Sequence, residues 1–187
     1  GSSKSSTTAR AGLMALALAA GCSIAMEVPS NDWAAFRLTD DFNASARLGG
    51  LAYVSFTVGM VVGRFGGDSA ILRFGARSVG RLSLGVTIVG LAMSSLVNVE
   101  WIAIVGFVVA GLGIATQFPR LYDEAAKHPG RRGSGLGALT AGATIALLLT
   151  PRVIGPRAGA SLSVGAAMAM VTLPAAVVFA GLRVRRA

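Results

Sequence analysis

The sequence predicts an all-α membrane protein with six transmembrane helices, and three observations point to this fold. Six apolar stretches divide the 187-residue chain, and each is near the ~20 residues that cross a ~30 Å hydrocarbon core as a helix. Charged residues make up only 13% of the chain, about half the ~25% of ordinary soluble domains. Basic residues concentrate on alternate connections between the stretches. The stretches are Ala11–Met26, Leu48–Gly63, Leu82–Val99, Trp101–Pro119, Gly133–Pro151 and Ala158–Leu182.

The first apolar stretch follows a polar start. Residues 1–10 are rich in Ser and Thr, which predicts a cytoplasmic linker or tail before a six-helix transmembrane domain at residues 11–187. The first stretch is a span and not a cleaved signal peptide, because five further spans come after it. The polar segment from Glu27 to Ala46 predicts the first external loop, with Pro29 ending or kinking the first helix.

The second and third stretches are joined by a short segment rich in Gly and Arg. Asp68 is placed to cap a short helix from Ser69 to about Arg73, which Gly75 ends in a left-handed conformation. We expect Gly66 and its neighbouring glycines to let adjacent helices approach closely. The segment contains Gly63, Arg64, Gly67, Asp68, Arg73, Gly75 and Arg77.

The fourth stretch ends in a pattern that resembles the end of the first. Gln117-Phe-Pro119 and Glu27-Val-Pro29 each place a long polar residue two positions before a proline. Such a match is expected if the chain is built from two inverted three-helix repeats, since spans one and four then correspond and run in opposite directions.

The fifth stretch begins with small residues, including Ser134 between Gly133 and Gly135, which favour tight helix packing. An intramembrane serine protease is the competing interpretation. That chemistry needs a membrane-embedded base, and the single histidine, His128, falls in a predicted cytoplasmic loop. We therefore expect no enzyme activity, and no metal or cofactor.

The basic residues predict the orientation. With the N-terminus inside, thirteen Lys and Arg residues fall on the cytoplasmic side and four on the other, so both termini are expected in the cytoplasm. The net charge of +9 is then explained by topology and by attraction to an anionic leaflet, and nucleic-acid binding is not expected. The four are Arg37, Arg47, Arg152 and Arg157.

The pattern G-R-x-x-G-D-x-x-x-x-R-x-G-x-R, from Gly63 to Arg77, resembles the signature loop of the major facilitator superfamily. Glu27-x-x-x-x-Asp32-Trp33 and the Gly111–Pro119 run resemble the fucose-permease-like branch of that family. The resemblance covers residues 11 to about 182 and implies the C-terminal six-helix half of a twelve-helix transporter. It implies that residues 1–10 end the central loop and that an N-terminal half, in the same or a separate chain, is the partner.

Glu27 is the first candidate for a functional residue. An ionisable side chain in a span is costly and usually faces the bundle interior or water, which suits a proton-coupling carboxylate; a solvated group at the membrane edge is the alternative. Asp32 with Trp33 would bind a polar solute by hydrogen bonding and stacking, or lie at the interface. Two further pairs of hydroxyl or amide residues would line a cavity or bond within the bundle. They are Tyr53 with Thr57 and Thr116 with Gln117.

These observations predict a multi-pass protein of the cell membrane that transports a small polar solute by alternating access. The solute is expected to be sugar-like, and transport to be coupled to protons, as half of a secondary transporter. The alternative is a small membrane scaffold or regulatory protein without transport activity.

Overall fold

The computed structural model describes residues 2–128 and 133–184, and within these ranges the chain is helical, with no strand. Helix α3 begins at the Ser45 N-cap, whose hydroxyl accepts a hydrogen bond from the Leu48 amide. The helices are α1 (Ser2–Asp32), α2 (Ala34–Phe42), α3 (Ala46–Phe74), α4 (Ala76–Leu96), α5 (Glu100–Ile114), α6 (Gln117–Ala126), α7 (Ser134–Ile154) and α8 (Val164–Val184).

Six spans long and apolar enough to cross a bilayer are present in the described residues, which confirms the predicted fold class. Helices α1, α3, α4, α7 and α8 each supply one span, and α5 with α6 supply the fourth. Pro119 lies in the first turn of α6, where its missing N–H leaves no intrahelical bond unmade. Residues 2–10, predicted as a linker or tail, form the first turns of α1.

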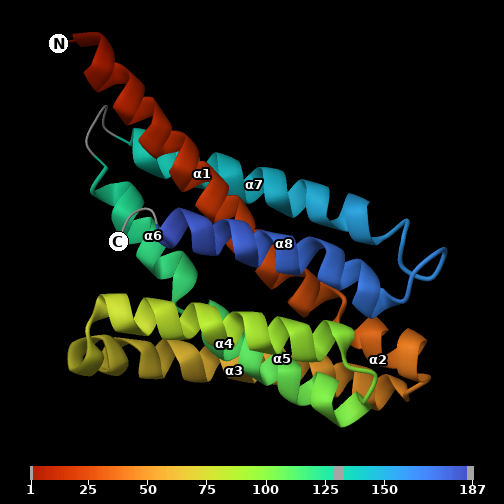
Figure 1. Cartoon of the computed structure of the whole chain (residues 1–187). Coiled ribbons are helices and arrows are strands. Elements are labelled where there is room, and N and C mark those ends of the chain that lie inside the picture. Colours follow the sequence, from red (N-terminus) through yellow and green to blue (C-terminus); the bar gives the residue numbers. More distant parts are fainter. Residues whose placement is uncertain (1, 129–132, 185–187) are drawn as a thin grey trace.

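The helices lie in two layers (Figure 1). One layer holds α1, α7 and α8, and the other holds α3, α4 and α5, with α4 and α8 in contact across the interface. Short helix α2 reaches from the first layer onto α3, and short helix α6 reaches from the second onto α7. These two helices lie at opposite ends of the bundle (Figure 1), which are called the α2 end and the α6 end.

Glycines bring the helices of each layer into backbone contact. A Cβ on Gly142 of α7 would lie 1.9 Å from the Ala17 carbonyl oxygen of α1. In the other layer, a Cβ on Gly59 of α3 would lie 2.1 Å from the Val108 carbonyl oxygen of α5. Without these glycines the backbones could not approach so closely, because real Cβ contacts are longer.

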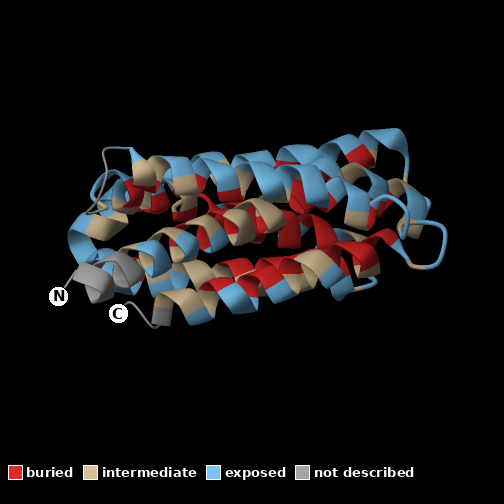
Figure 2. Cartoon of the chain, turned by 90° about the horizontal axis from the view of Figure 1, so that it is seen from above, coloured by how far each residue is buried: buried red, intermediate tan, exposed pale blue. Residues whose placement is uncertain are grey.

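The core lies between the layers, and the outer faces carry apolar side chains. Figure 2 shows buried residues gathered in the interior and exposed ones on the outside. Phe56, Leu91, Phe107 and Met168 are at most 2% exposed. The exposed outer faces are nevertheless rich in Leu and Val, as expected where helices contact lipid.

Two sequence predictions about local structure were wrong. The segment from Glu27 to Ala46 is mainly helical, because α1 continues through Pro29 to Asp32 and α2 follows at once. The Trp33 amide donates to the Pro29 carbonyl oxygen at 3.1 Å, so the backbone ladder is kept past the proline.

Asp68 caps no short helix, because α3 runs unbroken to Phe74. Gly75 then separates α3 from α4 with a positive φ of 81°, as predicted, but with ψ of 148°, outside the left-handed helical region. Gly63 and Gly67 do make close contacts with the fourth span, whereas a Cβ on Gly66 would meet nothing within 4 Å.

We expect Gly142→Ala to lower the free energy of unfolding by ~1–3 kcal/mol, because the added methyl group forces α1 and α7 apart. Gly137→Ala on the same helix is the control, since a Cβ there meets nothing within 4 Å, and it should be neutral or stabilising by up to ~1 kcal/mol. Denaturant unfolding of both variants in the same detergent measures the difference. Equal stabilities would show that the α1–α7 contact is not tight.

Candidate functional site

Glu27 lies in the last two turns of α1 and is half-buried. Leu18, nine residues earlier, is 54% exposed. Because successive residues of an α-helix are rotated by ~100° about its axis, Glu27 and Leu18 lie on opposite sides of α1. Glu27 therefore lies on the side of α1 that faces away from Leu18.

Asp32 and Trp33 mark the break between α1 and α2. Asp32 is exposed and accepts a hydrogen bond from the Asn31 amide at 3.1 Å. Trp33 is half-buried and packs against the core. They follow Glu27 by more than one helical turn, so the acid and the indole lie nearer the α2 end than Glu27 does.

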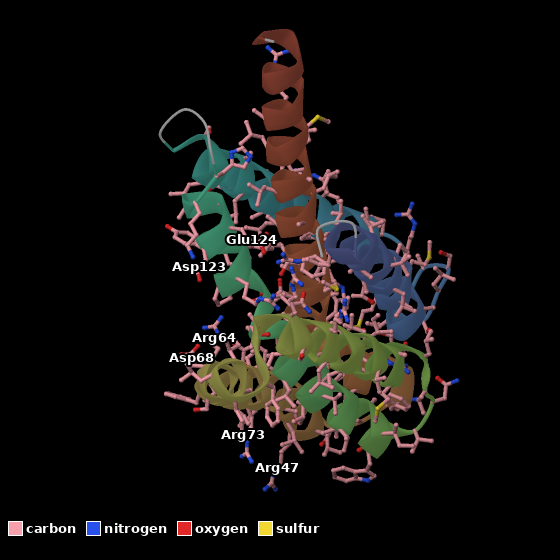
Figure 3. All side chains as sticks on the ribbon, turned by 60° about the vertical axis from the view of Figure 1, so that its left-hand side comes forward. Arg47, Arg64, Asp68, Arg73, Asp123 and Glu124 are labelled. Carbon is pink, nitrogen blue, oxygen red and sulfur yellow. The ribbon has the colours of Figure 1, made fainter. Side chains whose placement is uncertain are left out.

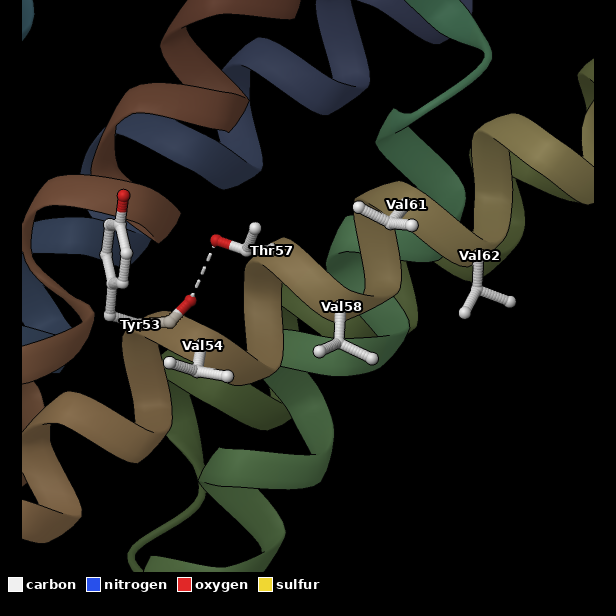
Figure 4. Close-up of a pocket in the computed structure, with 6 residues that line it drawn as sticks. All are labelled: Tyr53, Val54, Thr57, Val58, Val61 and Val62. Carbon is white, nitrogen blue, oxygen red and sulfur yellow. Dashed lines mark hydrogen bonds between the residues drawn. The ribbon is translucent and has the colours of Figure 1, made fainter.

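Tyr53 and Thr57 lie one turn apart on the outer face of α3. With Val54, Val58 and Val61 they line a shallow groove of about 210 Å³ (Figure 4). Thr57 donates its hydroxyl hydrogen to the Tyr53 carbonyl oxygen at 3.2 Å, the self-bonding that is common for hydroxyls in membrane helices. The groove is otherwise apolar, and Glu27, Asp32 and Trp33 are not in its lining.

Thr116 and Gln117 face α4 and form a separate polar cluster. Thr116 contacts the Ser83 hydroxyl at 3.0 Å, and the Gln117 amide donates to the Thr87 hydroxyl at 2.8 Å. Gln117 is 5% exposed, and its side-chain oxygen has no partner in the described part of the chain. The predicted site residues therefore fall into three groups: one along α1, one on α3 and one between α4 and the fourth span.

The segment rich in Gly and Arg that begins at Gly63 extends α3 at the α6 end. Figure 3 shows Arg64 and Asp68 on α3, and Asp123 and Glu124 on α6. Arg64, Asp68 and Arg73 are exposed. Among the described residues Asp68 makes no ion pair within 4 Å, so any contact of its carboxylate with a cation needs a change of conformation or another chain.

The sequence analysis missed the most buried charged pair. Arg37 of α2, predicted in an external loop, is 1% exposed and pairs with Asp41 at 2.6 Å. Its guanidinium also donates to the Ser94 and Val97 carbonyl oxygens at the end of α4, at 3.2 and 3.1 Å. The i, i+4 spacing of an Arg and an Asp was the available signal.

A larger cavity of about 500 Å³ lies on the other layer, between α1, α7 and α8. Gly21, Cys22 and Thr150 are in its otherwise apolar lining. His128 fills a gap between α1 and α7, where a Cβ on Gly12 would lie 2.6 Å from its Nε2 atom. No group of three or more metal-ligand residues occurs among the described residues.

The chain is similar to a transporter. Over 115 residues, 62% of its length, it is 31% identical to the uncharacterized transporter y4wD of Sinorhizobium fredii (strain NBRC 101917 / NGR234). The aligned region covers 29% of that protein, so the chain spans less than a third of the length of this relative. No family model matches the chain, and no solved structure matches it. The chain is thus a multi-pass membrane protein with a transporter among its relatives.

We expect Thr87→Val to lower the free energy of unfolding by ~1–2 kcal/mol, because it leaves the buried Gln117 amide without its acceptor. Thr57→Val is the matched control. Both hydroxyls donate to the carbonyl oxygen four residues earlier. Thr57, however, is exposed, and its hydroxyl accepts no hydrogen bond from the described part of the chain. Thermal unfolding of both variants measures the effect, and an equal loss would mean that the Gln117 contact is unimportant.

Proposed function

We propose that this chain is the six-helix half of a secondary transporter of the major-facilitator type, and that it carries a small polar solute by alternating access. The observation that carries the proposal is the similarity to a transporter over 62% of the chain, together with six helices able to cross a bilayer. Transport is preferred over a scaffold role because Glu27 is half-buried within a span and lies opposite its exposed face.

The packing of the helices supports an inverted-repeat architecture. Residues 9–96 would form one repeat of three spans and residues 100–183 the other. If the two repeats are exchanged, α1 corresponds to α5, α3 to α7 and α4 to α8. The α1–α7 contact then corresponds to the α5–α3 contact, and the α1–α8 contact corresponds to the α5–α4 contact. All four contacts are present. Each layer then contains the first span of one repeat with the second and third spans of the other, so a pseudo-two-fold exchange of the repeats maps one layer onto the other.

The partner would be a second six-helix half, in the same or another chain. One such half supplies one wall of a pathway at the membrane midplane. The exposed face of α3 around Tyr53 and Thr57 is the surface we assign to that partner, because it joins two hydroxyl groups to a row of valines. Asp32 and Trp33 would contact the solute, as would Thr116 and Gln117 once the α4 contacts open.

Glu27 is the residue we assign to proton coupling. The Glu27→Gln amide keeps the shape and hydrogen bonding of the side chain and removes its titration. We expect the variant to fold and to keep solute counterflow, which requires no net proton movement, while uphill accumulation driven by a pH gradient falls to background. Glu100→Gln, at the first turn of α5, should accumulate solute like the unchanged protein.

The measurement uses liposomes that contain the full transporter, tested with hexoses, deoxyhexoses and polar amino acids. No flux for any of these solutes would favour the scaffold role. Flux with normal, pH-driven accumulation by Glu27→Gln would keep the transport function and remove Glu27 from the coupling mechanism.

The orientation is tested separately, with single cysteines in a Cys22→Ser background. Asn43 and Ser69 are exposed residues at opposite ends of α3. The excess of basic residues at the α6 end favours that end in the cytoplasm. In intact cells, Asn43→Cys should therefore react with an impermeant maleimide and Ser69→Cys should not. The reverse pattern would invert the topology and contradict the correspondence with the transporter family.

A further inference from the structure

The two short helices share a pattern of structure and charge. Each follows a break in a long span, at Trp33 (φ −103°, ψ −2°) and at Thr116 (φ −94°, ψ −5°). Each then carries an arginine four residues after the break and an acid eight residues after it. The pairs are Arg37 with Asp41 in α2 and Arg120 with Glu124 in α6.

At the α2 end, the charged pair joins the two layers. Arg37 donates to carbonyl oxygens at the last turn of α4, and Asp41 accepts from the Val164 and Gly165 amides of α8 at 2.9 and 2.8 Å. The positive group therefore meets the negative end of one helix dipole, and the negative group meets the positive end of the other. Gly165 is required here, because a Cβ would lie 2.6 Å from the Arg37 Nε atom.

At the α6 end, the corresponding pair contacts the opposite ends of the same two helices. Glu124 forms an ion pair with Arg183 of α8, and the Arg183 guanidinium lies 5.2 Å from the centre of the Phe179 ring. The Arg120 guanidinium occupies the space above Gly80 of α4, where a Cβ would lie 1.9 Å from its Nη1 atom. Charged side chains of α6 therefore contact both α4 and α8 at this end too.

We propose that these charged groups form two clasps, one at each end of the bundle, which hold the two layers together and open independently of each other. The α2 clasp is Arg37 with Asp41, and the α6 clasp is Glu124 with Arg183. Backbone contacts at glycines such as Gly142 and Gly59 join the helices within each layer. Between the layers, α4 and α8 make the main helix–helix contact, and the charged groups lie at its two ends.

The two clasps differ in burial, which gives them different strengths. The side chains of Arg37 and Asp41 are 2% and 10% exposed, whereas those of Arg183 and Glu124 are 21% and 37% exposed. Removing one partner of a buried pair leaves an uncompensated charge in a poorly solvated place, and an exposed pair loses much less. The α2 end is therefore the more tightly closed of the two.

The test measures how fast a buried cysteine at each end reacts with a polar maleimide, in purified chain without Cys22. Ser95→Cys reports on the α2 end, since Ser95 is 3% exposed and its carbonyl oxygen lies against Gly165. Ala125→Cys reports on the α6 end, since Ala125 is 3% exposed and its carbonyl oxygen lies against Gly135. Ser95→Cys replaces an oxygen atom with sulfur, and Ala125→Cys adds one sulfur atom.

Each reporter is combined with Arg37→Gln and, separately, with Arg183→Gln. Arg37→Gln should speed the reaction at residue 95 by about tenfold or more and leave residue 125 unchanged, because local opening exposes only the end that lost its charge pair. Arg183→Gln should speed the reaction at residue 125, by a smaller factor, and leave residue 95 unchanged. In each variant, an unchanged reaction rate at the opposite end shows that the protein is folded.

A charge exchange separates an oriented clasp from a simple ion pair. The double variant Arg37→Asp with Asp41→Arg keeps the pair but places an acid on the α4 carbonyls and a cation on the α8 amides. It should react at residue 95 at least as fast as Arg37→Gln. A reaction at residue 95 as slow as in the unchanged protein would mean that the charges at the ends of α4 and α8 do not contribute to the clasp. Faster reaction at both ends in either single variant, or at neither end, would overturn the proposal of two independent clasps.

Discussion

The bundle depends on close contact between helix backbones. Apolar side chains gain little by leaving lipid for a protein interior, because the two surroundings are equally apolar, so helices in a bilayer associate through van der Waals contact and hydrogen bonds. Gly142 and Gly59 allow that contact in the two layers. The leucines and valines of the outer faces stay exposed for the same reason, since these side chains remain in lipid and need no protein partner.

Against this background the few buried polar groups decide how the layers fit. The Arg37 guanidinium makes four polar contacts and tolerates little displacement, because each lost contact leaves a charge poorly solvated. The Gln117–Thr87 bond fixes the fourth span against α4 in the same way. Close backbone contact at glycines acts within the layers and, at Gly165 against the Ser95 carbonyl oxygen, between them as well. Charge complementarity at the helix ends acts between the layers.

The sequence predicted the six spans because hydrophobic length in a bilayer is a strong constraint that does not depend on the neighbouring helices. It did not predict α2, since a short amphipathic helix of nine residues is stabilised by what it packs against rather than by its own composition. For the same reason Arg37 was taken for a loop residue. The direction in which Gln117 faces depends on how α5 and α6 rotate against α4, which no local pattern specifies. Glu27, expected near the outer end of the first span, lies within α1 and is half-buried, and its role stays a prediction.

The division into layers has a consequence for how the chain is made. Helix α1 finds its main contacts in α7 and α8, more than a hundred residues later, and Asp41 finds its amide partners 123 and 124 residues on. During synthesis from the N-terminus, the first three spans enter the bilayer before any helix that completes the first layer exists. The Asp41 carboxylate therefore lacks its amide partners until the last span arrives, although the carbonyl partners of Arg37 on α4 are already present. The charged pair is thus completed only when the final helix of the membrane domain packs.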